Sequence, residues 1–160
     1  MFTSSTFLHQ MEASMIKILQ SLMFIMLATI VFQTNAASDD KPFAEQKVVL
    51  QISDADPTKQ TLVLNVASNL VKAYGQDKVD VEIVAFGPGL RLMFDDNHNK
   101  GRISSLSDSG VRFAACSNTM KKMTKVLGEA PKLNSNATQV SAGVVRIIDL
   151  VNDGYILVKP

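Results

Sequence analysis

The segment at residues 111–119 reads V-R-F-A-A-C-S-N-T, and its pattern decides how the rest of the chain can be arranged. Its first half is β-branched and aromatic, as in a strand, and it leads to Cys116, the single cysteine of the protein. Three small polar residues of the kind that favours helix N-caps come next, namely Ser117, Asn118 and Thr119. Residues 120–127 then carry apolar side chains at helical spacing. The segment therefore predicts a strand, a turn at Cys116 and a helix.

This position makes Cys116 a candidate nucleophile. A thiol at a strand-to-helix turn lies beside backbone N–H groups without a helical partner, at the positive end of the helix dipole. Cysteines in such places have pKa values of roughly 3.5–7.5, against about 8.5 for a free cysteine. The alternative is a small buried core residue, because a lone cysteine after an apolar strand commonly packs as one.

The composition fits one globular domain and no nucleic-acid-binding surface. The chain has 160 residues, of which 46% are apolar, and a formal net charge of +1. A nucleic-acid-binding surface normally has a basic excess, which a nearly neutral chain lacks. A local cluster of lysines at positions 121, 122 and 125 lies opposite the apolar residues of the predicted helix, and this favours a solvated face.

The first 36 residues have the pattern of a signal peptide. Lys17 precedes an uncharged run at 18–32, and Thr34 and Ala36 supply small residues for cleavage before Ala37. The run is shorter than the roughly 20 residues that a membrane span needs. Met15 is a candidate for the real start, because the residues before it fit poorly as an n-region. We expect an exported, periplasmic protein that leaves the membrane after cleavage; an uncleaved anchor is the alternative.

Export adds weight to the single cysteine. One cysteine cannot form an intramolecular disulfide. In an oxidising compartment, a leftover cysteine indicates intermolecular pairing or a free reactive thiol.

After a polar, flexible leader at 37–46, the folded domain covers 47–160. Strand patterns occur at 47–53, 79–86, 111–115, 138–140 and 155–158. Helical patterns occur at 57–74, 90–94, 103–109 and 118–127. A last helix, capped by Ser141, would bury an apolar face made of Val144, Ile147, Ile148 and Val151. This alternation predicts an α/β fold with an open, mainly parallel sheet of about five strands that helices cover on both faces.

Ligands of such sheets bind beyond the carboxyl ends of the strands. Three predicted turns meet at that edge, at 53–56, 86–89 and 115–118. In the second of them, Gly87 and Gly89 allow a positive φ or the close approach of a ligand, although a simple turn would need them too. Cys116 is therefore expected on the functional edge.

Other site chemistries find little support. The chain has neither G-x-G-x-x-G nor G-x-x-x-x-G-K-[ST], so a nucleotide site or a flavodoxin-like cofactor site has no phosphate-binding motif, and no cofactor is expected. Asp95, Asp96 and His98 match no metal site, and a solvated loop is favoured. A Cys–His pair would need His98 to fold over Cys116, which nothing in the sequence requires.

Three stretches carry a family resemblance. A-C-S-N-T at 115–119 follows a strand and opens a helix, F-G-P-G stands at 86–89, and S-A-G-V-V-R-I-I-D-L-V-N-D-G-Y stands at 141–155. Together they resemble the DsrE/DsrF-like sulfur-relay family, whose element reads A-C-x-N-T, over 47–160. The resemblance implies a three-layer α/β/α sandwich that assembles as homo-trimers or hexamers.

In the sulfur-transfer members of that family, the matching cysteine carries sulfane sulfur as a persulfide, which a partner cysteine takes over. The resemblance implies that Cys116 relays sulfur between donor and acceptor proteins, in a sulfurtransferase-like reaction. In this hypothesis the N–H groups of Ser117 and Asn118 stabilise the thiolate, Asn118 and Thr119 hold the turn, and residues 87–89 shape the adjacent wall. Those members work in the cytoplasm, whereas this chain is expected to be exported. The alternative is a non-catalytic oligomeric binding module with a structural cysteine.

Overall fold

A computed structural model describes residues 41–160, so the predicted signal peptide and the first four residues of the leader lie outside the described residues. In chain order the elements are β1 (Gln46–Ile52), α2 (Pro57–Tyr74), β2 (Val79–Ala85), η2 (Gly87–Met93), α3 (Lys100–Asp108), β3 (Arg112–Cys116), α4 (Ser117–Leu127), β4 (Ala137–Val140), α5 (Gly143–Asn152) and β5 (Ile156–Val158). η2 is a 3-10 helix that replaces the predicted turn at 87–89 and short helix at 90–94.

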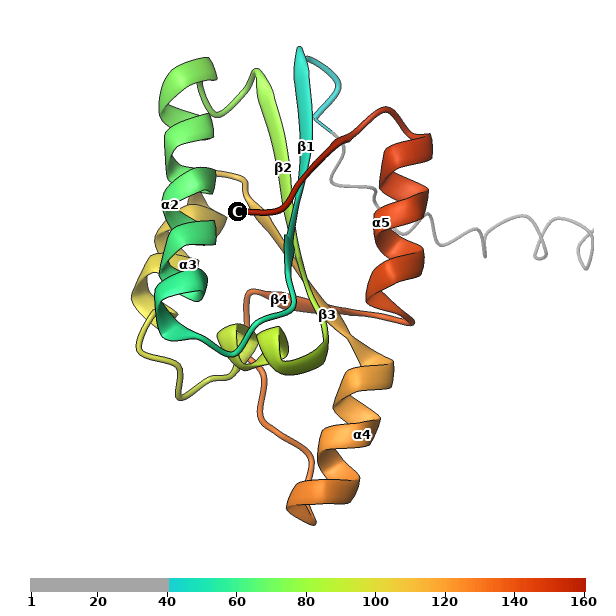
Figure 1. The fold of residues 1–160 in the computed structure, drawn as a ribbon. Helices are drawn as coiled ribbons and strands as arrows, with labels where there is room; N and C mark the ends of the chain where they lie inside the picture. Colours follow the sequence, from blue (N-terminus) through green and yellow to red (C-terminus); the bar gives the residue numbers. More distant parts are fainter. Residues whose placement is uncertain (1–40) are drawn as a thin grey trace, which may run out of the picture. The chain divides into compact units, whose positions relative to one another are not determined.

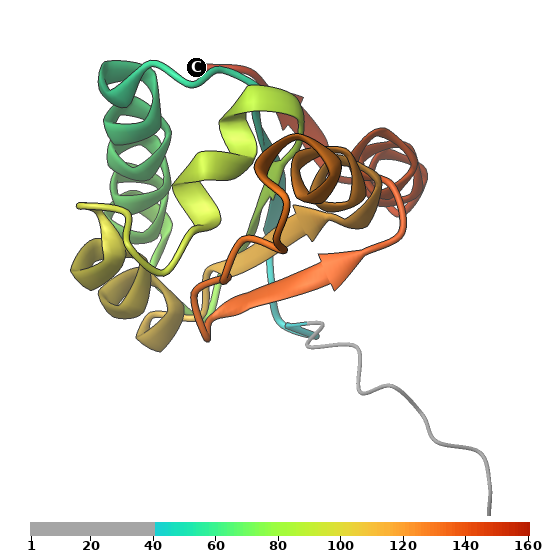
Figure 2. The same cartoon turned by 90° about the horizontal axis from the view of Figure 1, so that it is seen from below.

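The five strands form one parallel sheet in the order β4-β3-β2-β1-β5. Figures 1 and 2 show α2 and α3 on one side of this sheet and α5 on the other. Each side has its own core: residues of α2, η2 and α3 pack on one face of the sheet, and Ile147 and Leu150 of α5 pack on the other. This confirms the predicted three-layer α/β/α architecture.

The N-cap predicted for α2 is confirmed, whereas those predicted for α4 and α5 are not. Asp56 caps α2, where its carboxylate accepts a hydrogen bond from the Thr58 N–H at 2.7 Å, and Pro57 stands at the first helical position, as predicted. The predicted caps of the two later helices are wrong. Cys116 itself is the N-cap of α4 and Ala142 that of α5, and neither helix has a side-chain cap bond. Since α4 begins directly after β3, the last residue of the strand becomes its cap. α5 begins at Gly143, so Ser141 lies one position before the cap.

The two later helices also bury less of their apolar surface than their sequences predict. In α4 only Met120 is buried, while Leu127 is 54% exposed, and Figure 1 shows the helix extending beyond the end of the sheet. In α5 the sheet contacts Ile147 and Leu150. The remaining apolar side chains of α5 and those of β5 are exposed, and together we call them the α5–β5 surface: Val144, Val145, Ile148, Val151, Ile156, Leu157 and Val158. In β5, Leu157 lies on the face of the sheet that α5 covers, whereas Ile156 and Val158 lie on the other face.

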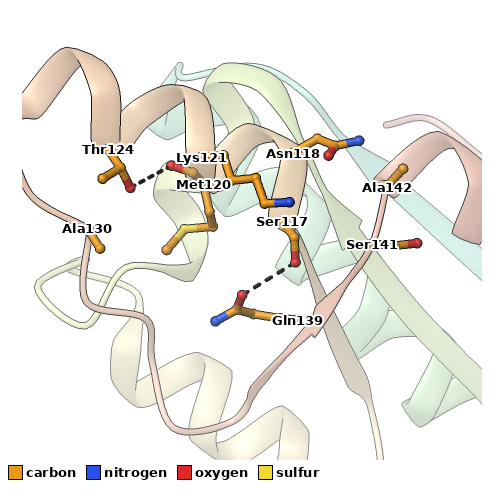
Figure 3. Close-up of a pocket in the computed structure, with 9 residues that line it drawn as sticks. All are labelled: Ser117, Asn118, Met120, Lys121, Thr124, Ala130, Gln139, Ser141 and Ala142. Carbon is orange, nitrogen blue, oxygen red and sulfur yellow. Dashed lines mark hydrogen bonds between the residues drawn. The ribbon is translucent and has the colours of Figure 1, made fainter.

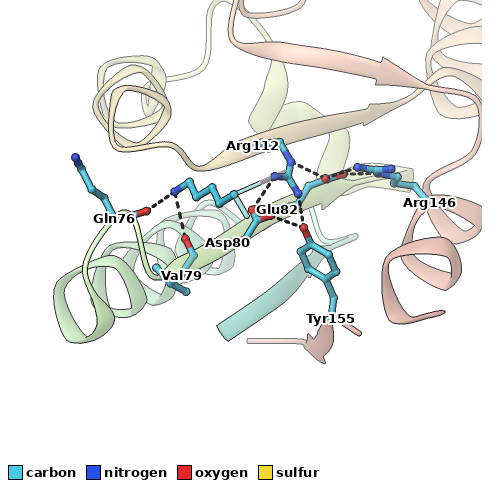
Figure 4. Close-up of polar contacts among 8 residues, drawn as sticks. Gln76, Val79, Asp80, Glu82, Arg112, Arg146 and Tyr155 are labelled. Atoms are coloured by element: carbon cyan, nitrogen blue, oxygen red, sulfur yellow. Dashed lines mark hydrogen bonds and ion pairs between the residues drawn. The ribbon is translucent and has the colours of Figure 1, made fainter. Parts of the chain in front are cut away.

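Beneath α5 lies a buried cluster of charged groups that the sequence analysis did not identify (Figure 4). Asp80 and Glu82 of β2 are 0% and 2% exposed. Arg112 of β3 donates to both carboxylates, at 2.7 Å and 3.1 Å. Arg146 of α5 donates to Glu82 at 2.6 Å, and the Tyr155 hydroxyl donates to Asp80 at 2.5 Å. The cluster joins β2, β3 and α5, and every one of its charges has a partner.

Among residues 41–160, no helix is both long and apolar enough to cross a membrane.

Candidate functional site at the carboxyl edge of the sheet

Cys116 lies at the carboxyl edge of the sheet, as predicted. It is the last residue of β3 and the N-cap of α4. Since all strands are parallel, the ends of β1, β2 and β4 reach the same edge. Cys116 pairs in register with Val140, the last residue of β4, so the connection from β4 to α5 passes beside the thiol.

The Cys116 thiol is free and nearly enclosed, with 5% of the residue exposed. Burial raises the pKa of this thiol, because it removes the thiolate from water. The Thr119 hydroxyl, the Gly143 N–H and the N–H groups of Thr119 and Asn118 act against burial, since each donates a hydrogen bond to the sulfur. Together these hydrogen bonds lower the pKa of Cys116 more than burial raises it, so the pKa lies below its ordinary value. The site thus favours the thiolate, which is the nucleophilic form.

Thr119 connects the thiol to the turn after β2. Its hydroxyl oxygen accepts a hydrogen bond from the Gly87 N–H at 3.0 Å, while its hydroxyl proton is directed to the Cys116 sulfur. Gly87 has a φ of +53°, a backbone conformation that glycine adopts without strain. The structure therefore brings Gly87, Cys116 and Thr119 together, three residues that the sequence marked separately.

Gly89 has a different role from the one considered for a ligand-facing glycine. A Cβ at this position would lie 2.5 Å from the Ile52 carbonyl oxygen and 2.7 Å from the Ser53 Cα. The lack of a side chain allows η2 to rest directly on the backbone at the end of β1. Gly89 thus packs two of the three predicted turns against each other.

Ser117 and Asn118 line a polar pocket of about 540 Å³ between α4 and the end of β4 (Figure 3). The Ser117 hydroxyl donates to the Oε1 atom of Gln139 in β4 at 3.4 Å. Lys121 and Ser141 also line this pocket. It provides room for a small polar molecule next to the turn that holds Cys116.

Gly143, Gln139 and Ser141 are site residues that the sequence analysis missed. A Cβ on Gly143 would lie 2.9 Å from the Phe86 Cβ, so glycine lets the start of α5 approach the sheet and bring its N–H to the sulfur. One signal was available: in a parallel sheet, the end of the strand at 138–140 must reach the same edge as the other strand ends.

The polar loop after η2 forms its own contacts. Asp95 pairs with Lys100 at 2.6 Å and with Lys132 at 3.0 Å, and His98 contacts the Asn99 side chain at 3.0 Å. The part of the chain that the structure describes contains no group of three or more His, Cys, Asp or Glu residues that could hold a metal ion.

Two solved structures are similar to this chain. MTH1491, a protein of unknown function from Methanobacterium thermoautotrophicum, matches with a TM-score of 0.65 and 29% identity over 72% of this chain and 100% of its own. The ychN protein from E. coli matches with a TM-score of 0.56 and 14% identity over 72% of this chain and 99% of its own. The sequence matches no protein-family model and no curated protein. Both neighbours have the DsrE-like α/β/α fold, and this chain shares it.

Replacing Thr119 by valine is expected to raise the pKa of Cys116, because it removes the hydroxyl that donates to the sulfur and keeps the shape of the side chain. The midpoint of the pH profile for alkylation by iodoacetamide should then move to higher pH. Ser117→Ala is the matched control, since the Ser117 hydroxyl contacts Gln139 instead, and its profile should follow that of the parent. Equal midpoints for Thr119→Val and the parent would show that the Thr119 hydroxyl does not act on the thiol.

Proposed function

We propose that this chain is an exported member of the DsrE/DsrF-like sulfur-relay family, and that Cys116 carries sulfane sulfur as a persulfide. The observation that carries the proposal is the set of four hydrogen-bond donors directed at the Cys116 sulfur. A thiol that only fills space in a core would need none of them. The DsrE-like fold and the A-C-S-N-T element at 115–119 support the same reading.

The reaction consists of two thiol exchanges. The Cys116 thiolate attacks the outer sulfur of a thiosulfate or polysulfide, a new S–S bond forms, and the old S–S bond breaks. The leaving sulfite or shortened polysulfide takes the electron pair, and Cys116 is left as a persulfide. An acceptor thiolate then attacks the outer sulfur, and the electron pair returns to Cys116 as the thiolate. The cysteine ends as it began, and no external oxidant or reductant is needed.

The neighbouring groups would act on both steps. The N–H groups of Asn118, Thr119 and Gly143 stabilise negative charge at the cysteine sulfur, which is present before attack and again after release. The polar pocket beside Ser117 and Asn118 offers a place for the donor molecule, and a cation is available there in Lys121.

Intact mass spectrometry after exposure to thiosulfate or polysulfide tests the proposal. We expect a gain of one sulfur atom per chain that a reductant reverses and that Cys116→Ser abolishes. Folding of the variant is checked by circular dichroism. If the folded parent gains no sulfur under conditions that alkylate Cys116, the persulfide proposal fails.

A second candidate function is a non-catalytic binding module of the same fold. The observation that favours it is the enclosure of Cys116, which is only 5% exposed. In that case Cys116→Ala would change the stability of the protein and leave its binding intact. The same mass experiment separates the two candidates, because a purely structural cysteine takes up no sulfur.

We also propose that the protein assembles with copies of itself through the α5–β5 surface, as the trimers or hexamers that the resemblance implies. Seven branched apolar residues on one helix and the adjacent edge strand are 36–58% exposed. Exposed apolar residues gathered on one helix and the neighbouring edge strand are uncommon on a monomer and mark an interaction surface. β5 is also an edge strand, with one side of its backbone unpaired in the sheet.

Ile148→Asp should dissociate the assembly, because it places a charge in the middle of the α5–β5 surface. We expect the molar mass from light scattering to fall to that of one chain, or the dissociation constant to rise by about 30-fold or more. Ser104→Asp adds the same charge to an exposed position of α3, on the other side of the sheet from α5, and should leave the mass unchanged. A parent protein that stays a single chain at high concentration would refute the proposal.

Export to the periplasm completes the proposed function. It is supported by the pattern of residues 1–36 alone. The sulfur donor and acceptor would then be molecules of that compartment.

A further inference from the structure

A second pocket, of about 270 Å³, lies on the opposite side of α4 from the polar one. We call it the η2–α4 pocket, because η2 and the segment after it form one wall and α4 forms the other. Of the residues that line this pocket, Thr119 and Gly87 also belong to the surroundings of Cys116.

The walls of the η2–α4 pocket are largely apolar. Phe94 and Met123 are half-buried side chains that pack against the core, and Val126 and Leu127 continue the apolar wall toward the outer end of α4. Val126 is 77% exposed and Leu127 is 54% exposed. An occupant with an apolar body would remove these side chains from water, which is favourable.

Two cations stand in the same walls. Arg91 of η2 and Lys122 of α4 line the pocket, and among residues 41–160 neither has an ion-pair partner. The lining includes no carboxylate. α4 carries Lys121, Lys122 and Lys125 and no acidic residue, so the potential around the pocket is positive.

We propose that the η2–α4 pocket binds a small organic anion, with its apolar body against Met123 and Val126 and its acidic head group between Arg91 and Lys122. The charge of the pocket selects an anion, and its apolar walls select a body larger than an inorganic ion. The volume lies just below the range of ligand pockets, which is about 300–1,000 Å³, so the ligand is a small molecule.

An anion bound in the η2–α4 pocket would change the surroundings of the Cys116 thiol. Thr119 lines the η2–α4 pocket and also donates its hydroxyl hydrogen bond to Cys116. This relation to sulfur transfer rests on the proposed function. The binding itself does not, and it can be measured on Cys116→Ser as well as on the parent.

Titration with octanoate, followed by NMR of the backbone amides, tests the proposal. We expect saturable shifts centred on η2, Phe94 and α4, with a dissociation constant on the order of 1 mM for a ligand of this size. Acetate lacks the apolar body and octan-1-ol lacks the charge, so both should bind at least about fivefold more weakly.

Two variants of α4 form the matched pair. Lys122→Gln should weaken octanoate binding by about three- to fivefold, as expected for a partly exposed charge pair. Lys125→Gln removes the same charge from the same helix outside the pocket, and it should bind octanoate like the parent.

Several results would overturn the proposal. They are an absence of saturable shifts in the folded protein, equal weakening by the two variants, octan-1-ol binding as tight as octanoate binding, or shifts centred on the α5–β5 surface. Shifts of η2 and α4 that grow with protein concentration alone would assign the pocket to a second copy of the chain and would also overturn it. Because persulfide formation is measured without octanoate, failure of one proposal is distinguishable from failure of the other.

Discussion

Arg112→Met is expected to lower the free energy of unfolding by about 3–5 kcal/mol, the range for breaking a buried ion pair by removing one partner. The side chains of Asp80 and Glu82 are 1% and 3% exposed, and Arg112 is the residue that donates to both. Without it, the Tyr155 hydroxyl still donates to Asp80, and Arg146 still donates to Glu82. Methionine fills much of the space of the arginine stem but cannot stabilise two carboxylates that have lost their water.

The tyrosine of this cluster stays a donor at neutral pH. Burial and its hydrogen bond to Asp80 raise the pKa of Tyr155 to about 12, although the hydrogen bond from Arg112 opposes them. A protonated hydroxyl therefore remains directed at Asp80 throughout the neutral range. It cannot replace Arg112, because it supplies no charge.

Urea denaturation followed by circular dichroism measures the effect. Arg102→Met is the matched control, since the side chain of Arg102 donates an exposed hydrogen bond to Asn65 at 2.7 Å. It should cost no more than about 0.5 kcal/mol. If the two variants unfold at the same urea concentration, the buried cluster does not contribute to stability as described.

Gly89→Ala is the second large effect, with an expected loss of about 1–3 kcal/mol in the free energy of unfolding. The new Cβ would lie 2.5 Å from the Ile52 carbonyl oxygen and 2.7 Å from the Ser53 Cα. Both contacts are with backbone, which cannot rotate away as a side chain would. Relief therefore requires η2 to move off the end of β1, and its buried residues, such as Leu90 and Met93, to lose packing with it.

Gly101→Ala tests whether this effect belongs to the position. Gly101 is exposed in α3, has no positive φ, and has no atom within 4 Å of the place of a Cβ. Alanine should be neutral there or stabilise the helix by up to about 1 kcal/mol. Thermal unfolding of both variants provides the comparison, and a Gly89→Ala protein as stable as the parent would rule out the tight packing of η2.

The sequence was sufficient for the architecture because the strands and α2 have strong local signals. The runs that became β1, β2 and β3 are short and apolar, and Asp56-Pro57 sets the start of α2. Their alternation with helices predicts a parallel sheet, and the parallel sheet in turn places Cys116 at its carboxyl edge.

The orientation of α5 could not be predicted from its sequence. Apolar residues cover most of its circumference, so periodicity does not tell which part faces the sheet. The structure buries Ile147 and Leu150 and leaves Val144, Ile148 and Val151, expected in the core, 42–53% exposed. A helix with two apolar faces is what a protein with a further contact surface would have, and helical periodicity gives both faces the same signal.

The site was predicted in part: site residues close to Cys116 in the chain or on a neighbouring strand were found, and more distant ones were missed. Thr119 lies within three residues of Cys116, and the turn at Gly87 follows a neighbouring strand, so their proximity is a consequence of strand order. Gly143 could not be placed, because its N–H reaches the sulfur only through the pairing of β3 with β4 and the close approach of Gly143 to Phe86. The buried cluster around Asp80 could not be predicted for the same reason, because its partners are distant along the chain.

The origin of the donors at Cys116 makes its thiol a reporter of folding. The N–H groups of Asn118 and Thr119 belong to α4, the helix that Cys116 caps. The third N–H group belongs to Gly143, which follows β4 in the chain. An unfolded chain has none of this arrangement, so its thiol behaves as an ordinary cysteine. The proposed sulfur chemistry therefore requires the completed fold, and the alkylation rate of Cys116 can follow the docking of the segment from β4 to α5.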